Sequence, residues 1–171
     1  MSMTVFFHPC QFTGAEVVKK NPFTGKEQIT HPTSPLTEFQ IQSIQELLSQ
    51  YTPDNQGDNS GFRVIVFGAG AYQGSVVEVD VSDLANGCAI TLRGESPELY
   101  PFLFQLLAAA DWMMVVSQSE LFAIVESFDR LKKVPPNFMK IVQCQSAAQL
   151  AAFLGEGIRG AENYRKQVTG E

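Results

Sequence analysis

The sequence has few of the residues that mark common catalytic and metal sites. Its 171 residues include two His, one Trp and three Cys. Cys10, Cys88 and Cys144 stand far apart and form no Cys-x-x-Cys pair. An odd number of dispersed cysteines argues against a disulfide framework and against a zinc site, and it indicates a reducing cytoplasm. We therefore expect no metal and no cofactor.

Long apolar runs are also missing. The longest, at 102–116, is interrupted by Gln105 and Asp111 and is shorter than the ~20 residues that a membrane helix needs. The start of the chain has no positively charged segment followed by an apolar core, so it does not resemble a secretory signal. These absences predict a cytoplasmic protein that is not inserted in a membrane.

Charge is sparse and unevenly spread. Charged residues make up 18% of the chain and the net charge is −6. Residues 61–130 hold three Arg against nine Asp or Glu, whereas residues 131–171 are net basic. Nucleic-acid binding requires clustered Lys and Arg, so the acidic middle argues against it. The same charge would suit a basic protein partner, or simply form a well-solvated surface.

Length and composition predict one domain of the α+β class. With 44% hydrophobic residues, the chain can bury one substantial core. A strict alternation of strand and helix is absent, which favours a mostly antiparallel or mixed sheet with helices packed on one face. We divide the chain into a turn-rich segment with a capped helix (1–60) packed on the main domain, an α+β core (61–155) and a polar tail (156–171).

The local patterns predict most elements. Thr37 and Gln40 form a capping-box signature that opens a helix ending near 50–51. A buried helix follows 96–98 but starts regularly only at Pro101, a short helix covers 127–133, and Ser146 caps the last one. Flanking the turn at 21–26, residues 17–18 and 27–30 are either edge strands or extended loop. Apolar runs and period-two alternation predict strands at 4–8, 62–67, 75–81, 88–93, 112–116, 122–125 and 139–144.

The glycine-rich segment Gly68–Gly74 follows an apolar strand, as a dinucleotide-binding loop would. Such a loop must lead into a helix whose N-terminus binds the phosphates. Here the next residues, 75–81, alternate and are β-branched, so we predict a hairpin loop. Tyr72 lies in this loop and either packs back on the sheet or contacts a partner.

Other candidate sites are weaker. His8 and Cys10 flank Pro9 in an extended segment and would place a base near a thiol, but a strand-end His and a packed Cys explain them as well. His31 adds no recognisable nucleophile motif. Glu78 and Asp80 should project from the same side of one strand, and solvent exposure is sufficient to explain them. The 54–59 segment lacks the ligand spacing of a calcium loop.

These observations favour a non-enzymatic protein-interaction module, for example an acidic inhibitor or immunity-type protein of a bacterium. Tyr72, Glu78, Asp80 and Asp83 are the expected partner contacts. The alternative is a small-molecule-binding protein or enzyme with a cleft near Gly68–Gly74. A homodimer that exchanges an edge strand or the C-terminal tail is a third hypothesis.

Overall fold

The protein forms one α+β domain built on a seven-stranded mixed sheet, as the sequence predicts. The computed structural model describes residues 2–14, 16–52, 61–68, 74–117, 121–135 and 139–155. The strand order is β4-β5-β6-β1-β7-β8-β9, and all neighbours are antiparallel except β8 and β9. The sheet strands are β1 (Ser2–Pro9), β4 (Phe62–Phe67), β5 (Ser75–Asp80), β6 (Cys88–Gly94), β7 (Trp112–Ser117), β8 (Leu121–Val125) and β9 (Lys140–Gln143).

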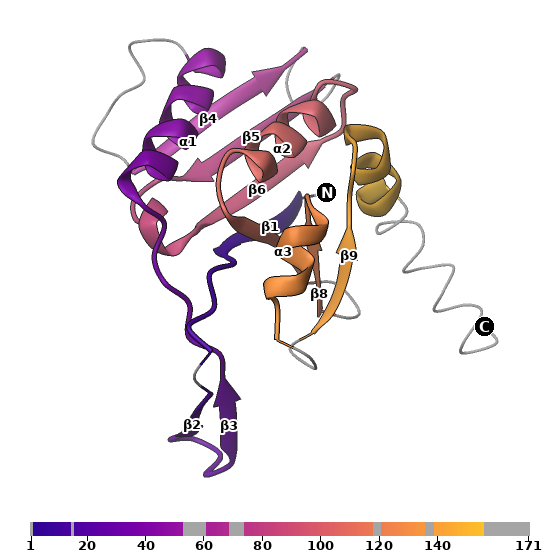
Figure 1. Cartoon of the computed structure of the whole chain (residues 1–171). Coiled ribbons are helices and arrows are strands. Elements are labelled where there is room, and N and C mark those ends of the chain that lie inside the picture. The colour runs from indigo at the N-terminus through magenta and orange to yellow at the C-terminus, as the bar shows by residue number, and fades with distance from the viewer. Residues whose placement is uncertain are drawn as a thin grey trace, which may run out of the picture.

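The main core lies between the sheet and the helices α1 (Glu38–Tyr51) and α2 (Leu99–Ala108) (Figure 1). Every second side chain of the strands points into it, because successive residues of a strand face opposite sides. Trp112 and Phe7 pack at its centre with ring centroids 4.8 Å apart, and the Trp112 indole N–H donates to the Leu106 carbonyl at 2.9 Å. Helical residues 147–155 add Leu150 and Leu154 to the same core.

Helix boundaries follow the capping chemistry, with one correction. The Thr37 side chain accepts from the Gln40 N–H, and the Gln40 side chain accepts from the Thr37 N–H, so the predicted capping box is confirmed. Helix α2 begins at Leu99, so the prediction of a regular start only at Pro101 was wrong. Proline is accommodated there because the first N–H groups of a helix have no acceptor within the helix.

A second, smaller cluster covers the other side of the sheet at its β7–β9 end. Met113, Ala123 and Val125 alternate with side chains of the main core and pack instead with Cys10 and Val134. Leu131 of α3 (Phe128–Lys133) packs against this cluster. The prediction of a short helix at 127–133 is confirmed, and the helix covers a face that its sequence alone did not indicate.

Helix α3 is anchored by the half-buried Arg130. Its guanidinium donates to the Leu107 carbonyl at 2.7 Å and lies 3.5 Å from the Asp111 carboxylate. Glu126 lies 3.6 Å from the same guanidinium, and Lys133 makes a second contact with Asp111 at 3.1 Å. The side chain of Arg130 thereby joins the end of α2, the start of β7 and α3.

The segments left open as strands or loop form a hairpin of β2 (Val17–Lys20) and β3 (Glu27–Thr30). This hairpin, which we call the arm, projects away from the rest of the molecule (Figure 1). At its base, Phe12 and Thr33 form an isolated bridge.

Candidate interaction face

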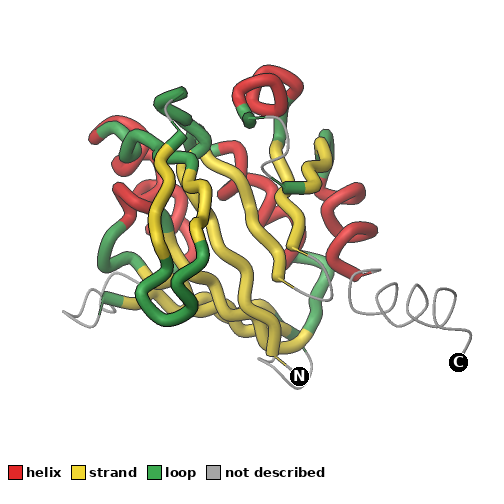
Figure 2. Tube along the Cα trace, turned by 90° about the horizontal axis from the view of Figure 1, so that it is seen from below, coloured by secondary structure: helices red, strands yellow, loops and turns green. Residues whose placement is uncertain are grey.

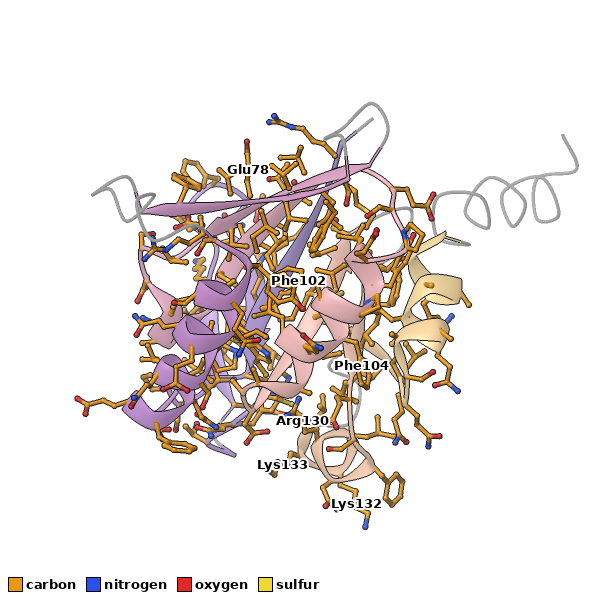
Figure 3. All side chains as sticks on the ribbon, turned by 90° about the horizontal axis from the view of Figure 1, so that it is seen from above. Glu78, Phe102, Phe104, Arg130, Lys132 and Lys133 are labelled. Atoms are coloured by element: carbon orange, nitrogen blue, oxygen red, sulfur yellow. The ribbon has the colours of Figure 1, made fainter. Side chains whose placement is uncertain are left out.

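The outer side of the sheet at the β4-β5-β6-β1 end is not covered by any described helix, and we call it the open half. Helices lie mainly along one side of the strands in Figure 2, and Glu78 in Figure 3 points to the side opposite Phe102. The strand register aligns the outward side chains in rows across four strands. The outward residues are Phe62, Val64 and Val66 from β4, Val76, Glu78 and Asp80 from β5, Ala89, Thr91 and Arg93 from β6, and Thr4, Phe6 and His8 from β1.

Large apolar side chains are exposed on the open half. Phe6 is 45% exposed, Phe62 51%, Val64 38% and Val66 56%. Single exposed apolar residues are ordinary, but a group of them on one face is typical of an interaction site. Here Val64 and Val66 share one strand, and Phe62 begins it.

The charged groups of the open half are mostly carboxylates. Glu78 lies 3.4 Å from Arg93 on the neighbouring strand. The hydroxyl of Ser82 donates to the Asp80 carboxylate at 2.6 Å and its backbone N–H does so at 3.0 Å; these bonds hold the pKa of Asp80 below its usual value. Asp80 is therefore ionised at neutral pH.

A depression of about 270 Å³ lies where β5 ends and β6 begins, beside β1. Asp80, Asp83 and His8 line it together with Phe6. Both carboxylate oxygens of Asp83 accept from the Asn86 amide, at 3.1 and 2.9 Å, so the carboxylate is fixed in orientation. The His8 Nδ1 donates to the Pro9 carbonyl at 2.9 Å. The depression thus combines an aromatic residue with two carboxylates that are held by hydrogen bonds.

Gly87 lines the depression, and its backbone conformation requires a glycine. Its φ is 124°, in a region that other residues rarely adopt, and a Cβ there would collide with the Phe7 carbonyl. A residue with a side chain would therefore disturb both the turn into β6 and the adjacent strand β1.

The predicted contact residues are distributed as follows. Glu78 and Asp80 project from the same side of β5, as predicted. Asp80 and Asp83 are brought to one depression, whereas Glu78 lies farther along the strand. Tyr72 lies outside the described residues, as does the 54–59 segment. Sequence reasoning weighed His8 only against Cys10 and missed its position beside Asp80.

The thiol of Cys10 is unsuited to nucleophilic chemistry. It is fully buried, and burial together with the nearby Asp111 carboxylate raises its pKa to about 11. A nucleophilic cysteine needs the thiolate form at neutral pH. The Sγ of Cys10 instead lies 3.9 Å from the Arg130 carbonyl, in the second cluster. The interpretation of Cys10 as a packed residue is confirmed.

The glycine-rich segment, of which the structure describes Gly68 and Gly74, connects two antiparallel strands. Phe67 pairs with Ser75, and β4 and β5 are antiparallel neighbours, so the chain passes from Gly74 directly into a strand. A side chain at Gly74 would collide with the Phe67 carbonyl, which explains the glycine. No helix begins at Gly74, and the arrangement that binds a dinucleotide pyrophosphate at a helix N-terminus is therefore not formed there.

No protein-family model, curated protein or solved structure matches this chain. Within the described residues, His, Cys, Asp and Glu form no group of three that could hold a metal ion. The helices in that part of the chain are too short or too polar to cross a membrane.

Proposed function

We propose that this protein is a non-enzymatic interaction module that binds a basic protein partner through the open half of its sheet. The observation that carries this proposal is the group of exposed apolar side chains, Phe6, Val64 and Val66, on the face that also holds the depression with the carboxylates Asp80 and Asp83. Aromatic and aliphatic side chains supply most of the binding energy in protein interfaces, while surrounding charges select the partner and speed association.

The class of partner follows from the charge of this face. The acidic middle of the chain supplies Glu78, Asp80 and Asp83, and the outward side chains that we list for the open half include one Arg, Arg93, and no Lys. Such a surface attracts a basic protein and repels an acidic one. An acidic inhibitor or immunity-type protein, acting in the cytoplasm, is the specific form of this proposal.

Affinity capture from cells that naturally make this protein tests the proposal. The wild-type protein should capture a basic protein, and a Val64→Lys/Asp80→Lys variant should lose it. Phe39→Lys, on α1 and 78% exposed, is the matched control and should retain the partner. Capture that is equally strong with the Val64→Lys/Asp80→Lys variant, or no specific capture at all, would contradict the proposal.

A small-molecule site is the second candidate, and the depression beside His8 favours it. This depression lies at the opposite end of β5 from the Gly68–Gly74 loop, where sequence reasoning expected a cleft. Thermal-shift screening with small cations and amines, compared between wild type and Asp83→Asn, separates this candidate from the first. Stabilisation of the wild type alone would favour it.

A further inference from the structure

The side chains of the arm strands are exposed at all but one position. Val18 and Ile29 face each other across its two strands and are 59% and 60% exposed, and Phe23 at the tip is 96% exposed. An isolated two-stranded hairpin is marginally stable in water unless another surface covers it. The apolar side chains of the arm therefore indicate a surface that binds it.

The tip of the arm is nevertheless well defined. The Asn21 side chain accepts from the N–H groups of Phe23 and Thr24, at 2.8 and 3.2 Å, and the Asn21 N–H donates to the Lys26 carbonyl at 2.8 Å. These bonds hold the turn in one shape and present the Phe23 ring to solvent. An aromatic side chain held in this way binds with little loss of conformational entropy.

The arm is also the basic part of the N-terminal third. Lys19, Lys20 and Lys26 are the only lysines in residues 1–60, and no arginine occurs there. Among the ion pairs of the described residues, none involves these lysines, and none involves Asp80 or Asp83. The arm and the depression are thus complementary in charge.

The depression lies at the base of the arm. His8 lines it just before the chain enters the arm, and after the arm the Leu36 N–H donates to the Ala85 carbonyl at 2.8 Å, next to Asn86. The arm projects away from its base (Figure 1), and no residue of its two strands lines the depression. A twofold axis near the middle of two antiparallel arms would therefore place each tip at the other molecule's base.

We propose that two copies of this protein form a dimer in which the arm of each docks on the open half of the other, with Phe23 in the depression. The ring of Phe23 packs against Phe6, and the arm lysines face Asp80 and Asp83. At about 270 Å³, the depression is smaller than the roughly 300–1,000 Å³ of sites for drug-sized ligands, so it suits a single side chain.

In this dimer the arm occupies the same face that the proposed function uses, and it thereby regulates binding to that face. The arm of a second copy covers the open half, so a basic partner must compete with self-association. Dilution, or a partner of higher affinity, frees the face. The dimer requires no other protein, and its existence can be tested separately from capture of the partner.

Sedimentation equilibrium of the full chain over a range of concentrations is the experiment. The wild type should show a reversible monomer–dimer equilibrium. Phe23→Ala should weaken the dimer by on the order of thirtyfold, as expected for a central aromatic anchor. Phe23 is almost completely exposed, so this change leaves the fold intact, which circular dichroism will verify. A dimer that Phe23→Ala does not weaken, such as one paired along β4, would overturn the proposal.

Reversing the charges of the arm and of the depression, separately and then in a mixture, tests whether these two surfaces contact each other. Lys19→Glu/Lys20→Glu and Asp80→Lys/Asp83→Lys should each weaken the dimer by about tenfold, and an equimolar mixture of the two variants should form a heterodimer more readily than either forms a homodimer. Lys132→Glu/Lys140→Glu, exposed and outside the arm, is the control and should behave like wild type. A wild type that stays monomeric at all concentrations, or a mixture without preferential pairing, would refute arm docking.

The outcomes separate the two proposals. A monomer that captures a basic partner through the open half refutes the dimer alone. An arm-dependent dimer that captures no partner refutes the proposed function alone.

Discussion

At the β7–β9 end of the sheet, the outward side chains Met113 and Val125 are buried beneath α3, whereas at the other end Phe6 and Val66 remain 45% and 56% exposed. Both halves belong to one sheet and both carry apolar residues in outward positions. In the covered half these residues contribute to stability, because their burial removes apolar surface from water. In the open half these residues stay about half exposed, so they contribute less to folding.

The largest expected effect is a difference in the free energy of unfolding between the same substitution in the covered half and in the open half. Val125→Asp places an unpaired charge in the covered half, where Val125 is fully buried, and should lower the free energy of unfolding by about 3–5 kcal/mol. Val66→Asp makes the same change in the open half and should alter it by less than about 0.5 kcal/mol. Urea denaturation of both variants is the measurement. Equal losses would mean that the open half is covered after all.

The next largest effect on stability is expected from removing the side chain that attaches α3 to the rest of the protein. Arg130→Ala removes the guanidinium that contacts Asp111, Glu126 and the Leu107 carbonyl, and should lower the free energy of unfolding by about 3 kcal/mol. Lys133→Ala removes a contact with Asp111 from a side chain that is 52% exposed, and should cost less than about 1 kcal/mol. Similar losses for the two variants would contradict the anchoring role of Arg130.

A smaller loss of stability is expected from a substitution at Gly87, which lines the depression. Gly87→Ala forces a side chain onto positive φ and against the Phe7 carbonyl, and should lower the free energy of unfolding by about 2 kcal/mol. Gly155→Ala, at the end of the described helical residues, meets only ordinary contacts and should be neutral or slightly stabilising. If Gly87→Ala is as stable as wild type, the turn into β6 has another conformation.

The smallest effect concerns the buried thiol of the covered half. The pKa of Cys10 is about 11 in the folded protein against an ordinary value of 9.0, so the unfolded chain releases this proton more readily. The thiol therefore costs no stability below pH 9, and stability falls progressively as the pH rises from 9 towards 11. Urea midpoints at pH 8 and pH 10 measure the fall, which should be smaller in Cys10→Ala. An unchanged fall in that variant would assign the effect to other groups.

Local structure was largely predictable from the sequence. The capping box at Thr37, the cap at Ser146 and the alternation along 75–80 each depend on neighbouring residues, and the structure contains the helix or strand that each predicts. The strand that follows Gly74, in place of a helix, was predicted for the same reason. Such signals act over a few residues, so a single sequence suffices to read them.

The candidate site was only partly predictable. Period-two alternation placed Glu78 and Asp80 on one side of a strand. The proximity of His8 and Asp80 depends instead on β1 lying beside β6, and no local pattern specifies which strands become neighbours. For the same reason the contact between Arg130 and Asp111, and the cover that α3 provides, could not be deduced from the residues alone.

The central position of β1 has a consequence for synthesis on the ribosome. This strand precedes both of its neighbours, β6 and β7, in the chain, and β7 ends at Ser117. During translation β1 therefore cannot pair with both neighbours until the chain up to Ser117 has been made, and Val5 and Phe7 lack the pairing with β7 in the meantime. Long-range pairing of this kind slows folding and leaves the nascent chain prone to aggregation, so a chaperone that shields the first strand should raise the yield of native protein.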